Sequence, residues 1–115
     1  MDALMRLYRA LEVLRSTGER EFPLQLAVSF AWVAAHDGCL QADIPEQIGM
    51  SRSSVSRCLD WLSSSHRSGK PGLNLIRRER DHIDRKRFRI WLTPKGEQFA
   101  RLIELQLKED SSNDR

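Results

Sequence analysis

The side chains best suited to chemistry in this sequence are the hydroxyl and guanidinium groups of "GMSRSSVSRCLDWL", residues 49–62. The first nine positions of this segment hold four serines and two arginines. Serine hydroxyls hydrogen-bond phosphates and base edges, and arginine offers paired donors to guanine or phosphate. Such a segment suits three structures: a flexible serine-rich linker, a phosphate-binding turn, or the exposed end of a helix that contacts a polyanion.

The apolar residues of the same segment favour the helix. Val55, Cys58, Leu59 and Leu62 follow the i, i+3, i+4, i+7 spacing of one helical face, which a linker would lack. A phosphate-binding loop would need several glycines and a lysine in register. Ser51 is a natural N-cap for a helix with a buried back, in which Cys58 is a small core residue. Its polar front consists of Arg52, Ser53, Ser54, Ser56 and Arg57.

The preceding residues predict a short partner helix. In "LQADIPEQIGM", Pro45 limits how far upstream the helix can run, Asp43 is positioned to cap it, and Gly49 ends it. Together with the turn "IGMS", the two helices resemble a helix-turn-helix, in which the second helix enters the DNA major groove.

A basic hairpin is expected next. After the loop 63–74, which contains Lys70, two strand-like runs cover Leu75–Arg80 and Arg87–Leu92, and the second alternates apolar and polar residues. Residues 77–89 hold seven Lys/Arg against three acids, and we expect Asp81 and Asp84 to ion-pair with arginines rather than act as catalytic carboxylates. A hairpin directly after a recognition helix is a wing.

The charge distribution supports nucleic-acid binding. Residues 51–89 carry eleven Lys/Arg against four Asp/Glu, whereas the other 76 residues carry eight against twelve. A basic centre between acidic flanks is the electrostatic footprint of a nucleic-acid-binding protein, with an anionic membrane surface as the weaker alternative.

Three further helices are expected to flank this basic centre. Residues 23–36 are apolar nearly all round, which predicts a buried helix with Phe30 and Trp32 in the core and His36 at its end, as a cap or on the surface. A second helix is predicted over 2–16; it is ended by Gly18 and carries leucines at 3-4-3 spacing. A third helix is predicted over 93–110 and begins with Thr93 and Pro94. The final residues, 111–115, are expected to fray. The leucine seam suits packing on its own domain and pairing with a second copy about equally; it consists of Leu4, Leu7, Leu11 and Leu14.

Composition excludes several classes of protein. At 115 residues the chain is expected to be one domain, 1–115, with a core over 23–92. Its apolar runs are too short for a membrane span and its N-terminus lacks a signal-peptide core, so we expect a soluble cytoplasmic protein without a membrane partner. We predict no disulfide, metal or cofactor site from Cys39, Cys58 and the scattered histidines, and no enzyme, since no nucleophile–base signature is present. The histidines are His36, His66 and His82.

Residues 37–96 resemble the winged helix-turn-helix of the MarR (multiple antibiotic resistance regulator) family. The matching motifs are "QADIPEQIGMSRSSVSRCLDWL" and "LIRRERDHIDRKRFRIWLTPKGE". The resemblance implies a mainly α fold with a small β-hairpin, a winged helix-turn-helix with flanking N- and C-terminal helices. It places the polar front of the 51–62 helix in the major groove. The adjacent minor groove would be reached by Arg85, Lys86 and Arg87.

Family members are typically homodimeric repressors or activators on pseudo-palindromic DNA. Their N- and C-terminal helices form the dimer interface, which fits the leucine seam together with Leu102 and Leu105. The sequence departs from the family pattern at Lys86, where an arginine is usual, so minor-groove reading passes to Arg85 or Arg87. The loop 63–74 is longer than usual, and only 19 residues follow Gly96, fewer than the family's dimerisation helices occupy.

We therefore expect a sequence-specific double-stranded DNA-binding transcriptional regulator. The alternative is a winged-helix module that binds another protein without contacting DNA, which the unusual loop and short C-terminal segment keep open. RNA binding is the weaker alternative, because the stacking aromatics of RNA-binding surfaces are missing, with Trp61 and Trp91 as the exceptions.

Overall fold

The computed structural model describes residues 2–17, 21–64 and 69–108. Five α-helices, a single 3-10 turn and three short strands follow one another within these ranges. The expected helix stop at Gly18, the histidine His66 and the expected fraying of 111–115 lie outside the described residues.

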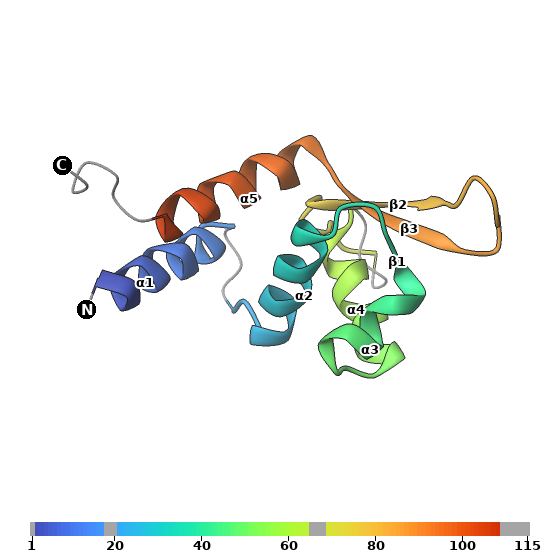
Figure 1. The fold of residues 1–115 in the computed structure, drawn as a ribbon, viewed down its shortest axis with the longest axis horizontal. Helices are drawn as coiled ribbons and strands as arrows, with labels where there is room; N and C mark the ends of the chain where they lie inside the picture. The colour runs from blue at the N-terminus through green and yellow to red at the C-terminus, as the bar shows by residue number, and fades with distance from the viewer. Residues whose placement is uncertain (1, 18–20, 65–68, 109–115) are drawn as a thin grey trace.

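Two long helices at the chain ends lie side by side at one end of the molecule. Helix α1 (Asp2–Arg15) runs antiparallel to α5 (Pro94–Leu107) along most of its length (Figure 1). Thr93 caps α5 as predicted, because its hydroxyl accepts a hydrogen bond from the N–H of Gly96 at 2.9 Å. Gly96 is required at this position, since a Cβ there would lie 1.9 Å from the carbonyl oxygen of Leu75.

A helical triad forms the middle of the molecule. Helix α2 (Leu24–Ala35) packs on α4 (Arg52–Leu62), and the short α3 (Ile44–Ile48), preceded by a 3-10 turn η1 (Gln41–Asp43), lies beside both (Figure 1). The predicted helix-turn-helix is confirmed as α3, a turn at Gly49 and α4. Asp43 precedes α3, but its side chain makes no capping hydrogen bond, so the predicted cap is wrong.

The wing is a three-stranded antiparallel sheet rather than a hairpin alone. Strands β2 (Ile76–Arg80) and β3 (Phe88–Leu92) form the predicted hairpin, with Ile76 opposite Leu92 and Arg80 opposite Phe88. A two-residue strand β1 (Cys39–Leu40) pairs with the other edge of β3, giving the order β1-β3-β2. This strand was not predicted, because two residues carry no periodicity to recognise.

The core lies where these elements meet. Its fully buried members include Phe30 from α2, Ile44 from α3, Leu59 from α4 and Ile90 from β3. Cys58 is also in this cluster, as predicted. No helix within the described residues has the length and apolarity that crossing a membrane requires.

Two expectations about the flanking helices are wrong in part. Helix α2 is not buried all round: Leu24 is 75% exposed, Val28 is exposed, and Trp32 is only half-buried. Leu14, predicted as part of a dimer seam, is instead 9% exposed and belongs to the core of its own chain. Leu24 and Val28 are thus exposed although the whole segment is apolar, so an apolar sequence alone did not fix its environment.

Candidate nucleic-acid interface

A cluster of serine hydroxyls forms hydrogen bonds at the N-terminus of α4. Ser51 Oγ accepts a hydrogen bond from the N–H of Ser54 at 3.1 Å, which confirms the predicted N-cap. The Ser51 hydroxyl donates to Ser54 Oγ at 2.9 Å and lies 3.2 Å from Ser53 Oγ. Because the free N–H groups of a helix start carry partial positive charge, this end of α4 attracts anions.

The predicted polar front divides into exposed and half-buried members. Arg52, Ser53 and Arg57 are exposed, whereas Ser54 and Ser56 are half-buried. The opposite face of α4 is held in the core by Val55, Leu59 and Leu62. Burial of one face therefore fixes which side chains a polyanion would meet first: the two arginines and Ser53.

Gly49 sets the angle between α3 and α4. It ends α3 in the left-handed conformation, with a φ of +67°, which costs glycine little and other residues more. The N–H of Met50 then bonds the carbonyl of Pro45 at 3.0 Å. The turn is thus closed before Ser51 begins the next helix.

The far end of the wing is organised by Asp81. Its carboxylate accepts from Arg89 Nε at 2.7 Å and from the N–H of Asp84 at 3.0 Å. The hydrogen bond from Arg89 is the largest cause that lowers the pKa of Asp81, from 3.8 to about 2. Asp81 therefore ion-pairs with an arginine, as predicted.

The other acid of the turn, Asp84, acts on the backbone. Its carboxylate accepts from the N–H of Lys86 at 3.1 Å, and its carbonyl accepts from the N–H of Arg87 at 3.0 Å. Arg80 adds a third link by donating to the carbonyl of Arg85 at 2.7 Å, while its guanidinium lies over the Phe88 ring. These bonds leave the side chains of Arg85, Lys86 and Arg87 exposed.

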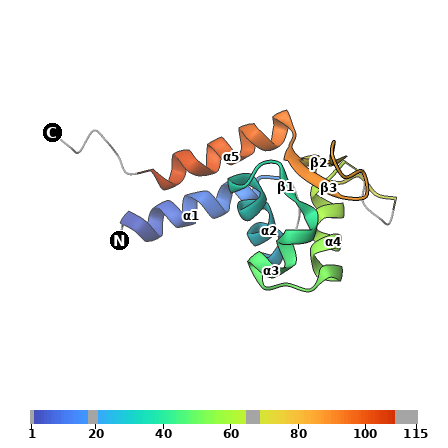
Figure 2. The same ribbon diagram turned by 45° about the vertical axis from the view of Figure 1, so that its right-hand side comes forward.

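The start of α4 and the turn end of the hairpin border one hollow of about 220 Å³. Arg52 of α4 lines one side of this hollow, and Lys86 and Arg87 of the wing also line it. Gln41 of η1 and Pro45 of α3 complete its lining together with their neighbours. Turning the molecule brings α4 and the hairpin to the same side, with α1 and α5 at the other end (Figure 2).

The structure does not gather every predicted site residue at this hollow. Ser53, Arg57 and Arg85 are exposed outside its lining, and Lys70 is exposed in the loop between α4 and β2. Sequence reasoning missed Gln41, which lines the hollow, and it missed Arg80 and Arg89, strand residues of the wing that hydrogen-bond to its turn. Of the bonds in the turn, the one from Arg80 to the carbonyl of Arg85 crosses from β2 to the far side of the turn, so it depends on how the chain reverses there.

A second, larger hollow of about 490 Å³ is lined by the end of α2, by β1 and by a residue of β3. Trp32 and His36, which stack on each other, line it together with Cys39 and Arg89. His36 ends α2 and is exposed, as predicted.

Burial raises the pKa of the Cys39 thiol to about 11, so this thiol is protonated and a poor nucleophile near neutral pH. Among the described residues, no three His, Cys, Asp or Glu side chains come together as metal ligands.

Comparison with known proteins gives matches among solved structures. No family model matches the sequence, and no curated protein matches it. The crystal structure of a MepR–DNA complex from S. aureus superposes with a TM-score of 0.67 at 22% identity, covering 86% of this chain and 73% of that chain. A MarR transcriptional regulator from Methanosarcina mazei Go1 gives 0.57 at 20% identity, covering 71% of this chain and 52% of that one.

A third structure, Streptococcus pneumoniae FabT in complex with DNA, has a TM-score of 0.62 at 18% identity, covering 89% of this chain and 67% of that chain. This chain thus spans between 52% and 73% of the length of the three. The likeness is not confined to residues 37–96, since it covers up to 89% of the chain. The chain therefore has the winged-helix fold of the MarR-type transcriptional regulators, as the motifs in residues 37–96 predict.

Proposed function

We propose that this protein is a sequence-specific regulator of transcription that binds double-stranded DNA as a homodimer in the cytoplasm. The observation that carries the proposal is the shared hollow, which is lined by Arg52 of α4 and by Lys86 and Arg87 of the wing. Cations from two separate elements around one concavity suit the phosphate backbone between a major and a minor groove.

The two elements have different tasks in this proposal. The exposed N-terminal half of α4 reads base edges in the major groove through Arg52, Ser53 and Arg57, because arginine can pair with guanine through two donors. Ser54 and Ser56 are half-buried in the same half of α4 and are assigned hydrogen bonds to the phosphate backbone of the DNA. Phosphate neutralisation falls to the exposed cations Lys70, Arg85, Lys86 and Arg87.

The matched structures support the assignment to DNA. Two of them, MepR and FabT, were determined in complex with DNA. Their matches cover 86% and 89% of this chain, which supports the same use of this fold here.

Pairing of two copies is the proposed role of the end helices. Leu4, Leu7 and Leu11 of α1 are between 44% and 59% exposed, and Leu102 and Leu105 of α5 are 44% and 56% exposed. Because α1 packs along α5, these side chains contribute to the surface of one helix pair. Burying them against a second copy would remove apolar area from water, which is the main driving force of association. Leu14 has no part in this surface, since it is in the core.

In vitro selection from random duplex DNA, using the full chain in moderate salt, tests the proposal. We expect recovery of a pseudo-palindrome whose half-sites are about one helical turn apart, the spacing that a two-fold dimer imposes. Recovery of a single half-site would refute the dimer. Failure to retain any duplex would refute DNA binding and favour a winged-helix module that acts by binding another protein.

A further inference from the structure

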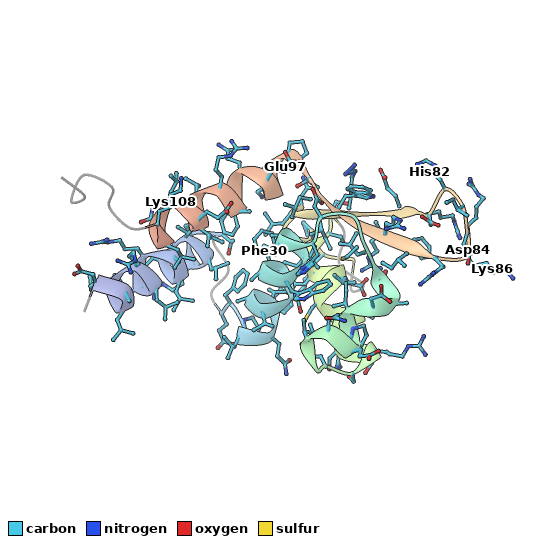
Figure 3. The ribbon with its side chains drawn as sticks, viewed as in Figure 1. Phe30, His82, Asp84, Lys86, Glu97 and Lys108 are labelled. Atoms are coloured by element: carbon cyan, nitrogen blue, oxygen red, sulfur yellow. The ribbon has the colours of Figure 1, made fainter. Side chains whose placement is uncertain are left out.

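Ile83 lies at the free end of the wing with almost its whole side chain in solvent. It is 95% exposed, more than any other large apolar side chain among the described residues. Its neighbours in the sequence, His82 and Asp84, are seen at the end of the hairpin together with Lys86 (Figure 3). An isoleucine there adds nothing to the core, so its contribution must be sought in what the wing touches.

The turn that carries Ile83 is held in one shape. The N–H of Asp84 bonds the Asp81 carboxylate at 3.0 Å, and the N–H of Asp81 bonds the carbonyl of Arg87 at 2.8 Å. The N–H of Arg87 closes the other side by bonding the carbonyl of Asp84 at 3.0 Å. An apolar side chain presented on an ordered turn loses little conformational entropy when it is buried by a partner.

The charges around Ile83 indicate which partner would bury it. Arg85, Lys86 and Arg87 are exposed within four residues of it, and Arg80 supports the same turn. Such cations would repel a basic protein surface and attract a phosphate-lined groove. The minor groove of DNA is narrow enough for a hairpin tip, and proteins that bind it insert apolar wedges such as Leu, Ile or Met between base pairs.

We propose that Ile83 is an apolar wedge that enters the minor groove beside each half-site and partly unstacks one base step. The proposal rests on the DNA-binding function proposed above. The cations beside Ile83 hold the two phosphate backbones, and the isoleucine is buried between base pairs. Pyrimidine–purine steps unstack most easily, so the wedge gives the protein a preference for such a step at a position that no polar side chain reads.

The test uses the full chain and the duplex recovered by the selection, with 2-aminopurine replacing each adenine in turn, because its fluorescence rises when it unstacks. We expect the wild type to raise the fluorescence at one step next to each half-site. Ile83→Ser should abolish this rise and weaken binding about tenfold, the effect of losing part of the burial of an isoleucine. Ile83→Leu should retain both the rise and the affinity, since leucine also acts as a wedge.

Leu24→Ser provides the matched control. Leu24 is also highly exposed, at 75%, but it lies at the start of α2, outside the lining of the hollow between α4 and the wing. This variant should bind and unstack DNA as the wild type does.

Three results would overturn the wedge: no fluorescence rise with the wild type, unchanged DNA affinity of Ile83→Ser, or equal losses in Ile83→Ser and Leu24→Ser. If either of the first two results is found while the protein still binds its DNA site specifically, the wedge is refuted and the proposed function is retained. Failure of the wild type to bind any duplex would refute the function itself.

Discussion

The guanidinium of Arg78 is ion-paired with the carboxylate of Asp60, and this contact joins strand β2 of the wing to helix α4. Their side chains are 27% and 15% exposed, so the pair is largely shielded from water. Within the described residues, the Nε of Arg78 is buried and has no hydrogen-bond partner. The Asp60 carboxylate is therefore the main compensation for burying this cation, and it ties together the two elements of the proposed interface.

Removing the carboxylate by Asp60→Ala should lower the free energy of unfolding by about 1–3 kcal/mol, because a shielded guanidinium would lose its charged partner. Urea denaturation followed by circular dichroism measures this. Glu12→Ala is the matched control: Glu12 pairs with Arg15 on the surface of α1, where the side chains are 39% and 75% exposed. Surface pairs contribute little, so the control should unfold almost as the wild type does. Equal losses in the two variants would contradict the role given to Asp60.

Changing Arg57 should affect sequence preference as well as affinity. Arg57 is exposed on the front of α4, and Arg57→Ala should cost about 1–3 kcal/mol on the selected duplex and relax the preference for one base pair. Competition binding against duplexes changed at single positions measures both effects. Arg101→Ala removes an arginine that is also exposed, from α5, and should leave sequence preference intact. If Arg57→Ala keeps the sequence preference of the wild type, Arg57 does not read a base.

Binding to DNA should weaken steeply with salt. If each complex engages about six phosphates, the logarithm of the affinity should fall with the logarithm of the salt concentration at a slope of about −5. Arg85→Ala removes one exposed cation from each wing and therefore two from the proposed dimer, so its slope should be shallower by about 1.8. Fluorescence anisotropy over a salt series gives both slopes. An affinity independent of salt would contradict phosphate neutralisation by the wing.

Acid should loosen the wing through Asp81. Its pKa in the folded protein is about 2, below the usual 3.8, so the contribution of its ion pair to stability is present above about pH 4 and is lost as the pH falls toward 2. Carbon NMR of the carboxyl should show this low midpoint. Asp81→Asn should remove the corresponding acid dependence of unfolding, whereas Asp2→Asn at the exposed start of α1 should retain it. A midpoint near the usual value would mean that Arg89 does not hold this carboxylate in solution.

The local elements could be predicted well from the sequence. Capping residues mark the starts of α4 and α5, and both Ser51 and Thr93 make the expected bonds. The apolar stripe of α4 placed its buried face correctly, so the exposed arginines followed. These predictions succeed because each depends on residues within one or two turns of the same helix.

Contacts between distant residues could not be predicted in this way. The Arg89 guanidinium donates to the carbonyl of Gly38, 51 residues away, and Asp37 accepts from the N–H of Leu92 across 55 residues. The pair of Asp60 and Arg78 belongs to the same class. No periodicity in the sequence encodes such partners, which exist only once the strands have paired.

The sequence by itself determined the helix-turn-helix, the basic hairpin and the apolar faces of their elements, because spacing and capping act over short distances. Only the tertiary structure decided that β1 joins the sheet and that Leu14 is in the core while Leu24 is exposed. It also decided that Arg52, Lys86 and Arg87 line one hollow. These features depend on how preformed elements dock, and docking is set by the combined burial of many side chains rather than by any one segment.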